Sequence, residues 1–155
     1  MNNTVASIRN SEKLTRIFGQ WPSFHDAEVL EIHLNRGNFV PSKKHSEMPF
    51  LTMTVWLWEM TKEVNEGGYF ILRNHTRCTF QFRDVSKLEL SDFNSQNAIW
   101  GLEIEKKERE EKPTPYFAVG VQPSFGIAAS FECVEIEITN AELLSAEEVA
   151  ALEES

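Results

Sequence analysis

The chain has 155 residues, of which 41% are apolar and 11% aromatic, and its formal net charge is -9. This length suits a single domain covering residues 1–155, and the apolar content is too high for a disordered chain. No apolar run approaches the roughly 18 residues that cross a bilayer, so we expect no membrane partner. Residues 1–9 lack a basic leader and an apolar signal core, which predicts a cytoplasmic protein.

The excess negative charge lies at the C-terminal end. Residues 113–155 contain eight Glu and no Lys or Arg, whereas residues 1–112 contain all 15 basic residues and 16 acidic ones. Nucleic acid phosphates require Lys and Arg, so we expect no nucleic acid partner. The acidic end either attracts a basic partner or only keeps the protein soluble. On the first interpretation, Glu132, Glu135 and Glu137 are candidate partner-binding residues.

Short helices are expected at both ends of the chain. Apolar residues between Thr4 and Phe18 recur at helical spacing, as one short helix or two, and Gly19 ends this segment. Near the C-terminus, Ser145 and Glu148 form a capping box that opens another short helix.

Most of the intervening chain alternates between apolar and polar residues, as half-buried strands do. The alternating segments are 28–35, 50–58, 78–83, 88–91, 100–105, 117–121 and 127–139, and residues 69–72 form a further strand-like stretch. In the last segment the apolar set changes phase after Cys133, which predicts a β-bulge near Cys133 or Val134. The mixed-sign run 103–112 is typical of a solvated hairpin arm or loop.

This pattern predicts an α+β fold. We expect a single domain with a largely antiparallel sheet of about seven strands and with N-terminal and C-terminal helices. Whether the sheet closes into a barrel stays open. Trp56, Trp58 and Trp100 fit a buried pleated face, and Cys78 and Cys133 are expected to be buried, reduced thiols and not a disulfide.

His25, Asp26 and Glu28 are the only compact group of ionisable residues with catalytic or ligand potential. No nucleophile, zinc-protease, phosphate-binding or dinucleotide motif accompanies them. The adjacent His25 and Asp26 side chains diverge on an extended chain, so a metal would need Glu28 or distant help from His33, His45 or His75. We therefore expect no catalytic residue, no metal and no cofactor, and we expect Asp26 to accept local backbone N–H bonds. A small metal-binding or hydrolase-like site at this group is the alternative.

A second polar concentration lies in residues 93–99. Asn94, Gln96 and Asn97 carry side chains that can both donate and accept hydrogen bonds. Two interpretations are open. These amides either tighten their own loop or contact a partner, and on the second interpretation they join the candidate partner-binding residues.

The block Gly19–Val29 resembles the opening of the bacterial immunity protein 50 family. The resemblance rests on Trp21, Pro22, Phe24, His25, Asp26 and Glu28, followed by an alternating strand, and segments 82–85, 93–99 and 131–133 are compatible with it. It implies a non-enzymatic cytoplasmic protein, encoded beside a polymorphic toxin gene, that binds and neutralises its cognate toxin. The acidic end would suit a basic toxin such as a nuclease. A general protein-interaction module is the other alternative, and a homodimer formed through an edge strand stays open.

Overall fold

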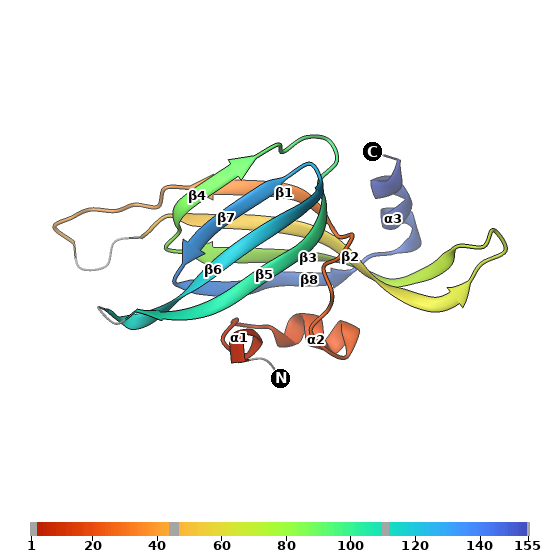
Figure 1. The fold of residues 1–155 in the computed structure, drawn as a ribbon, viewed down its shortest axis with the longest axis horizontal. Coiled ribbons are helices and arrows are strands. Elements are labelled where there is room, and N and C mark those ends of the chain that lie inside the picture. The colour runs from red at the N-terminus through yellow and green to blue at the C-terminus, as the bar shows by residue number, and fades with distance from the viewer. Residues whose placement is uncertain (1–2, 44–46, 110–111, 155) are drawn as a thin grey trace.

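The computed structural model describes residues 3–43, 47–109 and 112–154. Within these ranges eight antiparallel strands form one sheet in the order β4-β7-β6-β5-β1-β2-β3-β8 (Figure 1). The strands are β1 (Glu28–Asn35), β2 (Phe50–Val64), β3 (Phe70–Arg83), β4 (Ser86–Ser91), β5 (Ala98–Arg109), β6 (Lys112–Phe125), β7 (Ala128–Cys133) and β8 (Glu135–Leu143). The helices are α1 (Asn3–Ala6), α2 (Glu12–Phe18) and α3 (Ala146–Glu153). The expected α+β fold with an antiparallel sheet is confirmed.

The sheet folds over on itself into two layers and does not close into a barrel. β5, β6 and β7 cross in front of β1, β2 and β3 in Figure 1, and β4 and β8 are the two edges. The layers are joined in register at a single residue pair, Glu28 of β1 with Ala98 of β5. Regular strand pairing between the layers is therefore minimal, and side-chain packing supplies most of the contact between them.

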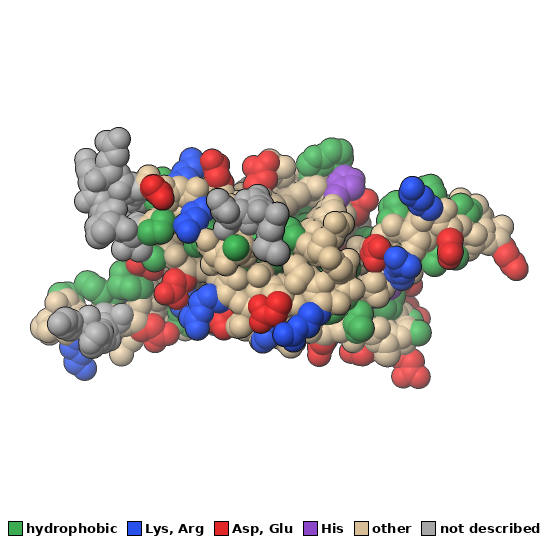
Figure 2. Space-filling view, turned by 90° about the horizontal axis from the view of Figure 1, so that it is seen from below, with side chains coloured by type: hydrophobic (Ala, Val, Ile, Leu, Met, Phe, Trp, Pro, Cys, Tyr) green, Lys and Arg blue, Asp and Glu red, His purple; other side chains and the backbone are tan. Residues whose placement is uncertain are grey.

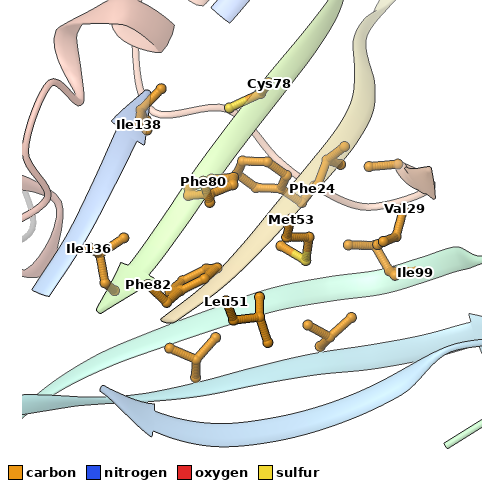
Figure 3. Packing of buried hydrophobic residues seen from close by; sticks show 14 of the residues in the cluster. Phe24, Val29, Leu51, Met53, Cys78, Phe80, Phe82, Ile99, Ile136 and Ile138 are labelled. Carbon is orange, nitrogen blue, oxygen red and sulfur yellow. The ribbon is translucent and has the colours of Figure 1, made fainter. Parts of the chain in front are cut away.

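The core fills the space between the two layers (Figure 3). Alternate residues of β2 and β3 are fully buried, and the facing side chains come from β5, β6 and β7. Phe82 of β3 meets Phe131 of β7 edge to face, with ring centroids 4.9 Å apart and planes at 78°. Each buried side chain of this size contributes about 1.5 to 3 kcal/mol through removal from water.

The expected β-bulge near Cys133 is wrong, because the chain changes layer there. β7 ends at Cys133 in one layer and β8 begins at Glu135 in the other, and the Val134 N–H donates to the Arg83 carbonyl at the crossing (2.9 Å). Phe131 and Ile136 thus enter the same core from opposite sides. The apolar residues change phase after Cys133 because the chain crosses from one layer to the other there.

The N-terminal helices lie against one side of the sandwich. Between α1 and α2, the backbone of Arg9 bonds to β8, donating to Ile136 and accepting from Ile138 at 2.9 Å each. Leu14 of α2 is completely buried in the core, and Gly19 ends the helix with φ of 78°. This segment partly covers the β8 edge, while α3 begins with the predicted Ser145–Glu148 capping box.

The two cysteines and the strand tryptophans were expected to be buried. Cys78 and Cys133 are free and buried as predicted, and burial raises the pKa of both thiols, to about 12 for Cys133. Trp56 is buried, but placing Trp100 in the core is wrong, since it is 61% exposed on β5. Residues 70–72 and 78–83 belong to one strand, β3. β5 and β6 form the predicted hairpin, apart from residues 110 and 111, which lie outside the described ranges. No helix in the described ranges is long and apolar enough to traverse a bilayer.

Candidate functional site

The block Trp21–Val29 joins the two layers of the sheet. The Asp26 N–H donates to the Ile99 carbonyl, and the Ile99 N–H donates back to the Ala27 carbonyl. The Val29 N–H donates to the Asn97 carbonyl, and all three bonds are 2.9 Å long. Asp26 has a φ of 69°, so the chain turns sharply just before β1. Two of the segments that carry the family resemblance, 19–29 and 93–99, therefore meet in space.

Aromatic contacts fix the entrance to this junction. Phe24 is buried, with its ring 5.7 Å from Trp21 and 5.8 Å from Phe80 between centroids. Pro22 is also buried, whereas Trp21 is partly covered and packs on the edge of the core. Aromatic pairs at such separations add to the stabilisation from burial. Trp21, Pro22 and Phe24 thus hold the turn in place.

His25 lies on the surface beside Trp100. Its Nδ1 is 3.0 Å from the Trp100 carbonyl oxygen, which can only accept, so Nδ1 carries the hydrogen in this contact. The two rings meet at right angles, with centroids 4.5 Å apart. His25 Nε2 is 3.6 Å from an Asp26 carboxylate oxygen, and both side chains are about half exposed. The arrangement orients an imidazole next to an exposed indole.

The three ionisable residues of the block do not converge. Glu28 Oε1 accepts from the Asn97 N–H at 3.4 Å, whereas His25 and Asp26 contact each other. The expectation that the Asp26 side chain ties the local backbone is wrong, because within the described residues its only partner is His25. Across the described ranges no group of three or more His, Cys, Asp or Glu is placed to hold a metal ion. His45 lies outside the described residues.

Asn97 organises the 92–97 loop from within. Its side chain is 3% exposed, and its Oδ1 accepts from the N–H groups of Asn94 (3.0 Å) and Ile127 (3.2 Å). Its Nδ2 donates to the Asn94 carbonyl at 2.7 Å. Asn94 Oδ1 in turn accepts from the Gln96 N–H, and the Gln96 side chain points into solvent. Two of the three predicted amides are therefore engaged inside the loop.

The glutamates of β7 and β8 are paired with basic residues from earlier in the chain. Glu132 lies 3.6 Å from Lys87, and Arg83 lies 3.7 Å from Glu135 and 2.8 Å from Glu137. Acidic and basic side chains alternate over the face seen in Figure 2. The charge segregation of the sequence is thus largely cancelled along these strands.

Among the glutamates of residues 113–154, those without a basic partner lie on α3 or directly after it. This helix carries Glu147, Glu148 and Glu153 followed by Glu154, and no Lys or Arg. Glu148 is engaged in the N-terminal cap, which lowers its pKa chiefly through the bond from the Ser145 N–H. Within the described ranges the other three form no ion pair.

A groove of about 500 Å³ separates α3 from the middle of β3 and the end of β8. It is lined by Asn74, His75, Leu143, Val149 and Glu153, among others. His75 Nδ1 accepts from the Trp56 indole N–H at 3.1 Å, so that nitrogen is unprotonated. Burial lowers the pKa of His75, opposed by the weaker effect of the Glu153 carboxylate.

The β2–β3 hairpin carries an exposed apolar surface that was not predicted from the sequence. Met60 (56% exposed), Val64 (54%), Phe70 (54%) and Leu72 (36%) lie beyond the body of the sheet. A signal was present in the four apolar residues Tyr69–Leu72 directly after the Gly67–Gly68 turn. A two-stranded hairpin cannot bury both of its faces, so such a run has to leave apolar side chains in water.

The sequence model of one protein family, described as Immunity protein 50, matches residues 10–144. This range includes all eight strands and α2. No curated protein and no solved structure matches the chain. The matched range contains the four segments that carry the family resemblance. In the structure segment 19–29 contacts segment 93–99, and segment 82–85 contacts segment 131–133, where Phe82 packs on Phe131. The chain therefore belongs to the Immunity protein 50 family.

Proposed function

We propose that this protein binds a cognate toxin and neutralises it by stoichiometric association, without catalysis. The observation that carries the proposal is the family match, because it extends over the entire sheet and not over a short motif. The geometry of the Trp21–Val29 block supports a role in holding the fold. Its aromatic residues pack into the core, its backbone joins the layers, and Glu28 points away from the His25–Asp26 pair.

The toxin that we propose is a basic protein such as a nuclease, and the protective encounter takes place in the cytoplasm. A nuclease needs Lys and Arg to hold phosphates, and its basic surface attracts carboxylates. The unpaired glutamates of α3 supply such carboxylates. Complementary charge accelerates association and selects among partners, which suits an inhibitor that has to capture its toxin quickly.

Co-expression tests the proposal directly. The protein encoded by the adjacent gene is expressed from an inducible promoter, with and without this chain. We expect growth arrest in the first case, restored growth in the second, and co-purification of the two proteins in equal amounts. A neighbour that is harmless alone would favour a general protein-interaction module, and persistent lethality in the presence of this chain would also count against neutralisation.

The alternative metal-binding or hydrolase-like role is tested separately. Protein purified without a His-tag is analysed for metals, alongside the His25→Ala variant. We expect the same metal content in both proteins and unchanged protection in the co-expression assay. Metal that the variant loses, together with a loss of protection at an unchanged melting temperature, would instead support a site at His25.

A further inference from the structure

The distal part of the β2–β3 hairpin projects beyond the rest of the sheet (Figure 1). β1 pairs with β2 only as far as Trp56, and β8 pairs with β3 only as far as Thr76. From Glu59 and Arg73 outward, the two strands pair only with each other. We call this segment, residues 59–73, the arm; Figure 2 shows it extending from the right side of the body.

One face of the arm is apolar. Met60 lies opposite Leu72 and Val64 lies opposite Phe70, and directly opposed residues of an antiparallel pair project to the same side. Phe70 and Leu72 are two residues apart on β3, so both pairs share one face. We call these four residues the arm face. Ile71 lies on the opposite face of β3, and Tyr69 directly precedes the strand.

The arm face continues toward the body of the protein through Trp58, two residues before Met60 on β2. The Trp58 ring lies 5.1 Å from that of Trp56 and 5.7 Å from that of His75, between centroids. His75 also lines the groove beneath α3. An apolar strip therefore runs from this groove to the tip of the arm. Contiguous exposed apolar surface on a monomer typically marks an interaction site.

The acidic side chains beside this apolar strip indicate a basic partner. Glu153 lines the groove, Glu147 lies on the same short helix, and Glu154 follows directly after it. None of the three has a Lys or Arg partner within the described ranges, whereas the glutamates of β7 and β8 do. An apolar anchor with an acidic rim complements a basic protein surface that contains an apolar pocket.

We propose that the arm face and the glutamates of α3 form the docking surface for the basic toxin. The inference rests on the proposed function and adds to it the location and chemistry of the contact. The apolar side chains of the arm fill a pocket of the toxin and slow its dissociation, while the α3 carboxylates accelerate association. Neither part belongs to the core, so both can be altered while the sheet stays folded.

The experiment compares two matched pairs of variants. The double variant Phe70→Thr/Leu72→Thr alters the arm face, and Tyr69→Thr/Ile71→Thr removes the two exposed apolar residues that alternate with Phe70 and Leu72 along the chain. The triple variant Glu147→Gln/Glu153→Gln/Glu154→Gln removes the three unpaired carboxylates and keeps the capping Glu148. Glu89→Gln/Glu105→Gln/Glu108→Gln removes three exposed carboxylates from β4 and β5, so the two triple variants have equal net charge. The probe is the purified protein encoded by the adjacent gene.

We expect the arm-face variant to bind the probe at least about tenfold more weakly than its control, mainly through faster dissociation. We expect the helix variant to associate several-fold more slowly than its control at low salt. This difference should shrink near 1 M salt, where the screening length falls to about 3 Å. Thermal melts should place all four variants near the wild type, and protection in the co-expression assay should follow affinity.

The outcomes separate the two proposals. If the wild-type chain neither binds nor protects, the proposed function fails and the docking surface falls with it. If the wild-type chain protects but the arm-face variant binds within twofold of its control, the docking surface is wrong and the proposed function stands. A wild-type dimer in analytical ultracentrifugation that this variant dissociates, with toxin binding unchanged, would assign the arm face to a second copy and overturn the inference.

Discussion

Gly126 lies directly over the buried amide of Asn97. A Cβ built on Gly126 would be 2.8 Å from Asn97 Oδ1 and would overlap the Gln96 carbonyl oxygen. Gly126 also has a φ of 91°, which disfavours any other residue. The β6–β7 turn and the 92–97 loop are therefore in contact through a position that has no room for a methyl group.

Gly126→Ala should destabilise the protein by more than about 2 kcal/mol, because backbone strain adds to the steric overlap. Gly68→Ala is the matched control. Gly68 has a similar φ of 84° at the tip of the β2–β3 hairpin, but nothing lies within 4 Å of its Cβ position. We expect it to cost about 1 kcal/mol from conformation alone. Urea unfolding measures both, and equal losses would contradict the proposed contact.

Asn97→Ala should lower the free energy of unfolding by about 2 to 4 kcal/mol, since it leaves the Ile127 and Asn94 N–H groups without an acceptor. Gln96→Ala, at the exposed neighbouring position, should change it by less than about 0.5 kcal/mol. Chemical denaturation of the two variants provides the comparison. Similar stabilities would show that the amide bonds do not hold the loop.

Asp26→Ala should lower stability by about 1 kcal/mol because of its left-handed backbone, and not through loss of a hydrogen bond. Asp26→Gly removes the same carboxylate but accepts a φ of 69° without strain. We therefore expect Asp26→Gly to remain at or near the stability of the wild type. If both variants melt equally early, the carboxylate itself is what stabilises the turn.

His75 should make stability dependent on pH. Burial lowers its pKa in the folded protein below the ordinary value of 6.5, so the unfolded chain binds a proton first on acidification. The contribution of neutral, buried His75 to the free energy of unfolding is fully present above pH 6.5. It is lost as the pH falls through 6.5 toward the lower pKa of the folded state. Protonation also removes the acceptor of the Trp56 indole bond.

The measurement is the difference in unfolding free energy between pH 7.5 and pH 5.5. We expect this difference to be smaller in His75→Gln than in the wild type. His33→Gln, which alters an exposed histidine on β1, should retain the wild-type difference. The same loss of pH dependence in both variants would rule out His75 as the source.

Local pattern predicted much of the fold. Alternation located the strands, and the Ser145–Glu148 box located the start of α3, because both depend on residues close in sequence. The split between β7 and β8 produced a visible phase change, but a bulge and a change of layer give the same pattern. Only the distant contact of Val134 with Arg83 distinguishes them.

The candidate site was harder to predict for the same reason. Trp100 alternates with polar neighbours as a buried residue does, yet it lies exposed on β5. Arg83 and Glu137 form an ion pair although they are distant in sequence, so no local pattern predicted that their charges cancel. The acidic end therefore looked uniform in sequence, whereas in space its unpaired part is confined to α3.

The division of the sheet into layers has a consequence for folding speed. β4 to β7 form one uninterrupted segment between β3 and β8, and the pairing of β3 with β8 brings together Thr79 and Thr139, 60 residues apart. The hairpins β2–β3 and β5–β6 can close locally, but β8 finds its place only after that long loop has closed. We therefore expect loop closure, and not hairpin formation, to limit the folding rate.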